Sequence, residues 1–284
     1  MKLIGAGTDW NTYLFEWRHA AQIHGWDYTI VGLGKKWQGF AIYMQWMQDE
    51  LGKLPPDELV FVVDTYDALV QKSPEETKEI YHQYFSKPIV YGCEASCMSA
   101  SLCHADAPKI CESNVFPRRY PNGGAMLGPA GLIKKIFDYG VEHKLKDDQL
   151  TMGRFWAENC ELIELDRDSR LVYNVMYGMG TKEVEGKHQL AHPDTNIVPV
   201  LIHMPGQPYD FGMRSRKARR TIIPSNKPMP ALGSLYEFAD QAKRTIFQCE
   251  EMYYIWIPPV VFVGLLIIGL VILLVLRHKS LTKT

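Results

Sequence analysis

Apolar residues follow two spacings along most of the chain. Unbroken apolar runs, such as 58–63, are typical of strands that are buried on both faces. An apolar stripe repeating every three to four residues, such as that over 12–24, indicates a helix. The runs predict strands at 2–6, 28–31, 58–63, 88–91, 161–165 and 200–203. The stripes and cap signals predict helices at 12–24, 40–51, 74–85, 130–139 and 148–158. Because strands and helices alternate, we expect an α/β fold, with an open, mostly parallel sheet and helices on both faces.

Two carboxylates follow the most apolar of the predicted strands. Asp64 ends the run VFVVD, and Asp67 comes three residues later. Open α/β sheets bind ligands beyond the carboxyl ends of their strands, so both side chains lie where chemistry is expected. Paired carboxylates suit Mg²⁺ or Mn²⁺, which often bridges to phosphates. The alternative is that Asp67 belongs to a turn and that Asp64 caps the next segment.

A glycine-rich loop, GLGKKWQG, follows the second predicted strand at 32–39. Glycines such as Gly34 let backbone N–H groups approach a phosphate. Lys35 or Lys36 can neutralise its charge, and Trp37 offers a stacking face. Taken by itself, the pattern also describes an ordinary surface loop.

Three weaker signals complete the candidate chemistry. The sequence Asn122-Gly123-Gly124 precedes an apolar run, and its alternative is a tight turn. Asp147 and Asp148 lie at a predicted helix start, where aspartate is also an ordinary capping residue. His203 ends the last predicted strand, where a lone histidine can equally be structural.

Composition narrows the function classes. The chain of 284 residues carries 31 Lys and Arg against 32 Asp and Glu, a formal charge of −1. Nucleic-acid binders usually show a clear basic excess, so we expect no nucleic-acid partner. Hydrophobic residues make up 46% of the chain, which is enough for a buried core and argues against global disorder.

The C-terminal part of the chain differs from the rest. Residues 255–276 carry no charged side chain, and a helix of that length spans a hydrocarbon core of ~30 Å. We therefore expect one membrane-spanning helix, with a buried core helix as the alternative. The segment 207–252 is rich in proline and includes the basic run RSRKARR, which predicts a stalk or a surface-wrapping segment. A short basic tail, 277–284, follows the span.

Two features of the sequence disagree about which side of the membrane holds the folded part of the chain. The N-terminus shows no signal-peptide pattern, which favours the cytosolic face. Basic residues follow the span while Glu250 and Glu251 precede it, which favours a cytosolic tail and a lumenal domain.

Cysteines cluster in one irregular region. Four of the six cysteines fall between Cys93 and Cys111, with His104 among them. Their spacings are wider than the C-x2-C pairs of most zinc sites. Zinc therefore stays an alternative beside one or two disulfides or reduced thiols.

Taken in order along the chain, the motifs resemble a known family. The glycine, lysine and tryptophan loop, the DTYD sequence, the Glu-x-x-Cys segment at 94–97, Asn-Gly-Gly, Asp-Asp-Gln and the strand-terminal histidine follow one another. This order resembles the glycosyltransferase domain of the lysyl hydroxylase/procollagen glycosyltransferase family over residues 1–206.

The resemblance implies a GT-A fold that transfers a hexose from a UDP-sugar to a hydroxyl of a glycan or protein, with Mn²⁺ (or Mg²⁺) as cofactor. It implies that the metal ligands are Asp64, Asp67 and His203. It implies that the donor is bound by Gly34, Lys35, Lys36, Trp37, Asp64, Thr65, Asn122 and Gly123. It implies that Asp147 and Asp148 face the donor sugar and the acceptor. The metal would stabilise the UDP leaving group, and either aspartate would orient the acceptor hydroxyl or stabilise the sugar cation.

Two departures from the family pattern concern the acceptor side. Met98 stands where the family usually has tryptophan, and Met204-Pro205 stands where it favours Asn-Gly. A catalytically inactive module that binds a nucleotide sugar or a glycan is therefore an alternative function. A membrane-tethered scaffold held by zinc at the cysteine cluster is another. No hydroxylase domain follows in the sequence, so we do not expect lysyl hydroxylation.

Overall fold

The computed structural model describes residues 1–9, 12–95, 107–111, 118, 120–176, 179–205 and 221–223. Packing divides the chain into two units, Met1–Asn226 and Lys227–Thr284, and all the described residues belong to the first. The expected span at 255–276, the tail at 277–284 and nearly all of the segment 207–252 lie outside the described residues. Within the described ranges, none of the helices has both the length and the apolar character needed to cross a bilayer.

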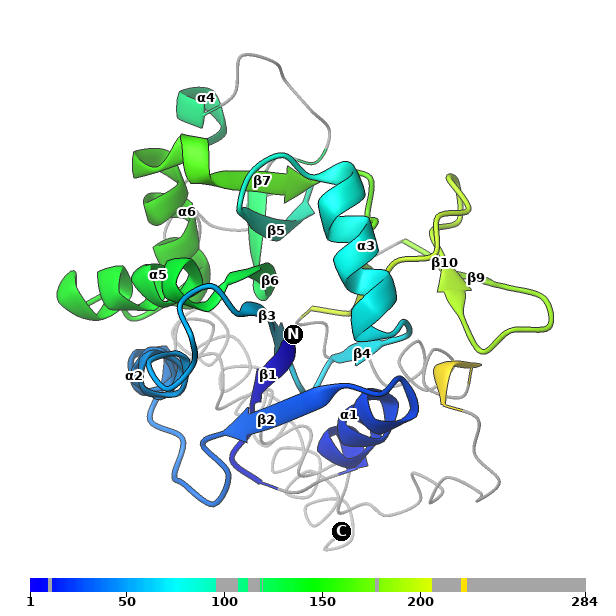
Figure 1. Cartoon of the computed structure of the whole chain (residues 1–284), viewed down its shortest axis with the longest axis horizontal. Coiled ribbons are helices and arrows are strands. Elements are labelled where there is room, and N and C mark those ends of the chain that lie inside the picture. The colour runs from blue at the N-terminus through cyan, green and yellow to red at the C-terminus, as the bar shows by residue number, and fades with distance from the viewer. Residues whose placement is uncertain are drawn as a thin grey trace, which may run out of the picture. The chain divides into compact units, whose positions relative to one another are not determined.

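A central sheet of six strands runs through the first unit in the order β2-β1-β3-β6-β5-β7 (Figure 1). Its strands are β1 (Lys2–Ala6), β2 (Asp27–Val31), β3 (Leu59–Asp64), β5 (Ile89–Glu94), β6 (Tyr120–Pro129) and β7 (Ile163–Asp166). The pairs β1–β2, β1–β3 and β5–β7 are parallel, as predicted. Strand β6 runs antiparallel to both β3 and β5, so the sheet is mixed and the prediction of a mostly parallel sheet needs this correction.

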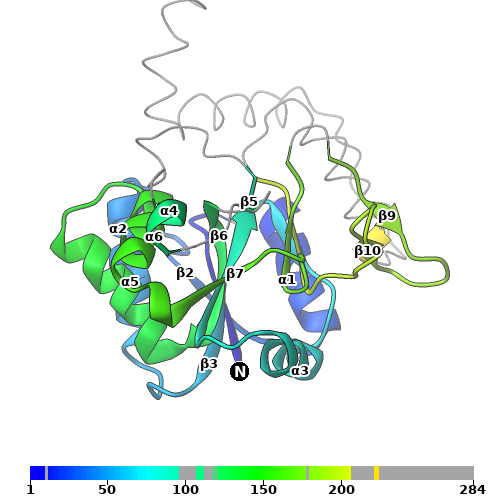
Figure 2. The same ribbon diagram turned by 90° about the horizontal axis from the view of Figure 1, so that it is seen from above.

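Helices cover both faces of this sheet, which confirms the α/β prediction. Helices α1 and α3 lie on one side of the sheet, and α2, α5 and α6 lie on the other (Figure 2). The six described helices are α1 (Thr12–Ile23), α2 (Phe40–Leu51), α3 (Pro74–Tyr84), α4 (Ala107–Cys111), α5 (Ala130–Glu142) and α6 (Asp148–Glu158). Alternate residues of β3 enter different cores: Phe61 and Val63 pack on the side of α1, and Val60 and Val62 on the side of α2. This burial on both faces explains why the run at 58–63 is continuously apolar.

A second sheet of three short strands lies beside the first, in the order β4-β11-β8. Its strands are β4 (Ala68–Val70), β11 (Leu201–His203) and β8 (Val172–Asn174). Strand β11 is antiparallel to β4 and parallel to β8. A hairpin of β9 (Lys182–Glu183) and β10 (Leu190–Ala191) follows β8 in sequence. The short sheet positions the end of β11 next to the residues that follow β3.

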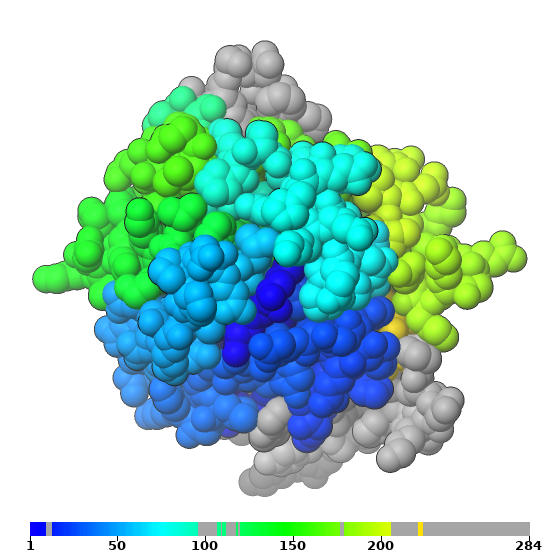
Figure 3. Space-filling view, viewed as in Figure 1, coloured from blue at the N-terminus to red at the C-terminus, as the bar shows by residue number. Residues whose placement is uncertain are grey.

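The amino ends of the parallel central strands lie at the other edge of the sheet, together with the carboxyl end of β6. The dark-blue start of the chain is visible at the centre of the space-filling view (Figure 3). A hollow of about 470 Å³ on this edge is lined by residues that include Met1, Glu58, Lys78 and His82. Because Glu58 precedes β3 and Asp64 ends it, this hollow lies at the opposite edge of the sheet from the predicted chemistry.

Two of the four clustered cysteines, Cys93 and Cys111, have partners other than zinc in the described part of the chain. Cys111 at the end of α4 forms a disulfide with Cys160, which begins the short 3₁₀ helix Cys160–Leu162 after α6. The buried thiol of Cys93 donates a hydrogen bond to the backbone oxygen of Asp166, and burial raises its pKa. A disulfide sulfur is not a thiolate ligand, and a buried thiol with a raised pKa resists becoming one. Cys97, Cys103 and His104 lie outside the described residues.

Candidate active site

Three side chains meet at the carboxyl edge of β3. Asp64 is the last residue of β3, Asp67 precedes β4, and His203 is the last residue of β11. Strand β11 pairs His203 with Ala68, and the backbone N–H of Met204 donates to the carbonyl of Asp67 at 2.8 Å. His203 Nε2 therefore lies 3.4 Å from Asp64 Oδ2 and 3.6 Å from Asp67 Oδ1. One ligand atom from each of the three residues lies within 4.8 Å of the other two.

The chemistry of these three atoms fits a divalent cation. His203 is 1% exposed, and among the described residues its Nε2 has no hydrogen-bond partner. Burial lowers the pKa of His203, but the carboxylates of Asp67 and Asp64 outweigh this effect and raise it to about 10. The same concentration of negative charge attracts a cation, and two carboxylate oxygens with one imidazole nitrogen suit Mn²⁺ or Mg²⁺.

Strand β6 passes directly beneath this triad of Asp64, Asp67 and His203. A Cβ atom built on Gly124 would lie 2.1 Å from His203 Cε1 and 2.8 Å from Asp64 Oδ2. Because Gly124 has no side chain, the His203 ring and the Asp64 carboxylate can approach each other above this position. Gly124 belongs to the extended strand β6, as do Asn122 and Gly123, so the alternative of a tight turn for these residues is wrong.

The two predicted catalytic aspartates have different surroundings. Asp147 is the N-cap of α6, and its Oδ1 accepts a hydrogen bond from the N–H of Leu150 at 2.7 Å. Asp148 is buried beside Gly123, whose added Cβ would lie 3.3 Å from Asp148 Oδ2. Burial raises the pKa of Asp148 well above its usual range, and the carboxylates of Asp147 and Asp64 raise it further. The structure therefore brings Asp148 close to the triad and gives Asp147 the capping bond that its position also predicts.

Sequence reasoning assigned no role to Glu94, although it ends the buried strand β5 in the same way that Asp64 ends β3. Glu94 is 4% exposed and accepts a hydrogen bond from Gln149 Nε2 at 2.7 Å. Its other oxygen lies 3.4 Å from the Asn122 amide nitrogen, and Asn122 Oδ1 in turn accepts from the N–H of Gly124 at 2.9 Å. Burial raises the pKa of this carboxyl. The strand-terminal position was the signal that could have found it.

The glycine-rich loop reaches the same edge through the end of β1. The N–H of Gly34 donates to the carbonyl of Thr8 at 2.8 Å. The ammonium of Lys35 lies 5.3 Å from the ring centroid of Trp46, and the half-buried Trp37 meets Trp46 edge-on at 6.2 Å. Lys35 and Lys36 are exposed. The loop thus presents positive charge over a packed aromatic base.

Thr65, predicted to contact the donor, uses its hydroxyl within the fold. The buried Thr65 hydroxyl donates to the carbonyl of Ala6 at the end of β1. The neighbouring Tyr66 hydroxyl accepts from the N–H of Thr8 at 3.0 Å, a link that sequence reasoning missed. The DTYD segment is therefore held against the end of β1 by two of its four residues.

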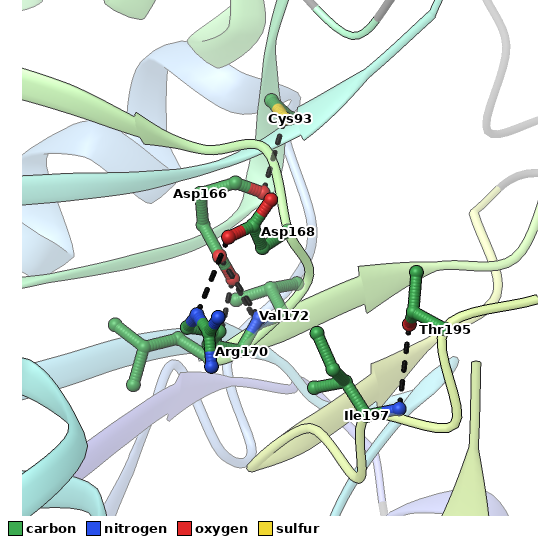
Figure 4. A network of polar contacts seen from close by, with 8 residues as sticks. Cys93, Asp166, Asp168, Arg170, Val172, Thr195 and Ile197 are labelled. Atoms are coloured by element: carbon green, nitrogen blue, oxygen red, sulfur yellow. Dashed lines mark hydrogen bonds and ion pairs between the residues drawn. The ribbon is translucent and has the colours of Figure 1, made fainter. Parts of the chain in front are cut away.

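A polar network holds the connection from β7 to β8 (Figure 4). The Asp166 carboxylate accepts hydrogen bonds from three successive backbone N–H groups, those of Arg170, Leu171 and Val172, at 2.7–2.9 Å. Burial raises the pKa of Asp166 to about 6, and the three donors oppose this increase, so the group is ionised at neutral pH. The network positions the first residue of β8, the strand that pairs with β11.

The sequence profile described as the PLOD GT domain matches residues 1–209. This match covers well over half of the chain, so the chain carries a glycosyltransferase domain. It belongs to the PLOD GT domain family, which confirms the resemblance seen in the sequence.

Curated relatives extend beyond the matched region. The "Uncharacterized protein R699" of Acanthamoeba polyphaga mimivirus is 28% identical over 193 residues, which cover 64% of this chain and 40% of that protein. The "Multifunctional procollagen lysine hydroxylase and glycosyltransferase LH3" of Homo sapiens is 22% identical over 196 residues, which cover 62% of this chain and 26% of that protein. The chain therefore spans less than half the length of either relative.

Two solved glycosyltransferase structures are similar at low identity. A glycosyltransferase involved in the glycosylation of the major capsid of PBCV-1 has a TM-score of 0.42 at 12% identity, and the match covers 78% of this chain and 97% of that one. The galactosyltransferase LgtC, in complex with donor and acceptor sugar analogs, has a TM-score of 0.45 at 12% identity, with 85% and 100% covered.

Proposed function

We propose that this chain transfers a hexose from a UDP-sugar to a hydroxyl group of a glycan or protein, with Mn²⁺ or Mg²⁺ as cofactor. The observation that carries the proposal is the convergence of Asp64, Asp67 and the buried Nε2 of His203 at the carboxyl edge of β3. Membership of a glycosyltransferase-domain family gives this site its reaction class.

Different residues of the chain would bind the cation, the diphosphate and the nucleotide. Asp64, Asp67 and His203 would hold the cation, which supplies Lewis acidity to the diphosphate of the leaving group. Lys35 and Lys36 add positive charge to the diphosphate from the exposed loop. Trp37 offers its ring to the nucleotide.

Asp148 is the residue that we assign to the sugar and the acceptor. Its carboxyl is buried near Gly123, and the carboxylate of Asp64 contributes to its raised pKa. A carboxyl in this position orients the acceptor hydroxyl or stabilises the positive charge that develops on the sugar ring.

The test is the release of UDP by the purified full-length chain across a panel of UDP-sugars, with and without Mn²⁺. We expect Mn²⁺-dependent release from one donor. Replacing both Asp64 and Asp67 by Asn should lower the rate by at least about 100-fold, because one misplaced or missing electrostatic contact already costs that much. The matched control is Asp138→Asn, which removes a carboxylate from the surface pair with Lys134.

Two outcomes would contradict the proposal. Undiminished turnover by the folded double variant would separate the activity from the triad. Binding of UDP by the wild-type chain, with no release from any donor, would favour the inactive nucleotide-sugar module.

For the membrane context, we propose that residues 255–276 form a single anchor and that the folded unit lies in an oxidising compartment. The disulfide between Cys111 and Cys160 supports the second part, because structural disulfides persist mainly in such compartments. The charge pattern around the span supports the same side. Protease protection of the unit in intact vesicles is the expected result, and digestion without detergent would contradict it.

A further inference from the structure

Asn174 lies between the histidine of the triad and the backbone of the central sheet. It is the last residue of β8, directly opposite His203 in the parallel ladder of β8 and β11. Its Oδ1 lies 2.7 Å from His203 Nδ1, and its Nδ2 donates to the carbonyl of Cys93 on β5 at 3.0 Å. Both Asn174 and His203 are 1% exposed, so water does not compete for these bonds.

The partners of the amide determine which way it faces. A backbone carbonyl only accepts hydrogen bonds, so the NH₂ group of Asn174 must face Cys93. The amide oxygen then faces His203, and it too only accepts. His203 Nδ1 must therefore keep its proton, so the nitrogen that can give up its proton to bind a cation is Nε2, which faces Asp64 and Asp67.

Asn174 is itself held from two sides. A Cβ built on Gly92 would lie 3.0 Å from Val172 Cγ1 and 3.3 Å from Asn174 Nδ2, so a glycine there lets β8 lie close to β5. The start of β8 is fixed by the backbone donors to Asp166, and the Cys93 thiol donates to the backbone of the same residue (Figure 4). The amide thus occupies one orientation before any ligand arrives.

We propose that Asn174 is a positioning residue, which sets the orientation and the protonated nitrogen of His203 so that Nε2 is presented to a divalent cation. The inference rests on the proposed function, because it requires that the triad holds such a cation. Groups that orient a metal-binding histidine in this way typically change metal affinity by 10–100-fold when they are removed.

The first test measures Mn²⁺ affinity by titration, with free Mn²⁺ followed by electron paramagnetic resonance, on the full-length chain. Asn174→Leu removes the acceptor and keeps a similar volume, so we expect binding about 10–100-fold weaker than wild type. The matched control is Gln71→Leu. Gln71 is also a fully buried amide next to the short sheet, but it bonds to Leu190 and Pro199 instead of the triad. We expect Gln71→Leu to lower stability and to leave Mn²⁺ affinity within about threefold of wild type.

The outcomes separate this inference from the function on which it rests. If wild type binds no Mn²⁺, the metal-dependent function fails and the inference fails with it. If wild type binds Mn²⁺ and Asn174→Leu binds equally tightly, the inference alone is overturned.

A second measurement needs no folded Asn174 variant. In wild-type chain labelled with ¹⁵N-histidine and loaded with diamagnetic Mg²⁺, the resonance assigned to His203 by its loss in His203→Gln should show a proton on Nδ1. A proton on Nε2, with Nδ1 bare, would overturn the inference.

Discussion

Gly124→Ala is expected to disable the site by the addition of a single methyl group. Gly124 lies in the extended strand β6, a backbone conformation that alanine readily adopts, so collision alone causes the effect. The new Cβ would lie 2.1 Å from His203 Cε1, whereas ordinary contact begins near 3.4 Å. The ring or the strand must therefore yield by about 1.3 Å, the difference between these distances, in an interior that is close-packed.

The expected loss follows from this displacement. A misplacement of about 1 Å in a catalytic constellation costs roughly 100-fold in rate, which corresponds to about 2.7 kcal/mol in the activation free energy. The unfolding free energy should fall by about 1–3 kcal/mol, as is usual for overpacking. The assays are Mn²⁺ titration, UDP release and thermal unfolding.

The control is Gly180→Ala, because, apart from the chain neighbours of Gly180, none of the described atoms lies within 4 Å of a Cβ built at that position. Gly180→Ala should retain wild-type activity and stability. A folded Gly124→Ala chain with wild-type Mn²⁺ affinity would show that the triad tolerates the methyl group and would refute the reasoning.

Four further predictions address charge and covalent structure. The pKa of His203 is raised to about 10, so at neutral pH a proton on its ring competes with a cation. The apparent Mn²⁺ affinity should therefore increase by up to about tenfold per pH unit between pH 7 and 9. The same slope in His203→Gln would contradict this prediction. Asp147→Ala should lower the unfolding free energy by about 1 kcal/mol through loss of the cap. Asp148→Asn should instead lower the rate of UDP release without lowering the melting temperature, because burial opposes the charge of Asp148. If Asp147→Ala lowered the rate and Asp148→Asn lowered the stability, the two aspartates would have the opposite roles. Reduction of the Cys111–Cys160 disulfide, which closes a loop with a sequence separation of 49, should lower the unfolding free energy by up to about 4 kcal/mol in urea titrations with and without reductant. A chain with both cysteines replaced by serine should lose this part of the response to the reductant.

Much of the central sheet could be predicted because its strands are buried on both faces. The strand that ends at Asp64 is continuously apolar, so its position and the carboxylates after it were visible in the sequence. The direction of β6 was not, because an apolar run shows burial and carries no information about strand polarity. The short strands β4 and β8 were missed because three residues are too few to show any period.

The site divides in the same way. Asp64 and His203 stood out because each ends an apolar run, and Asp67 stood out because it follows Asp64 by three residues. Asn174 and Glu94 follow such runs as well, but their function depends on which strands become neighbours. That information lies in the pairing of β8 with β11 and of β5 with β6, which no local pattern in the sequence contains.

His203 is the last of the three predicted metal ligands to be synthesised. Asp64 and Asp67 leave the ribosome early, but His203 lies on β11, the last strand of the described unit. A nascent or truncated chain that ends before residue 203 cannot complete the triad. Cation loading would then report that the chain has been made and folded at least as far as β11, and at 100 times the dissociation constant it would stabilise such a chain by about 2.7 kcal/mol over forms that lack this strand.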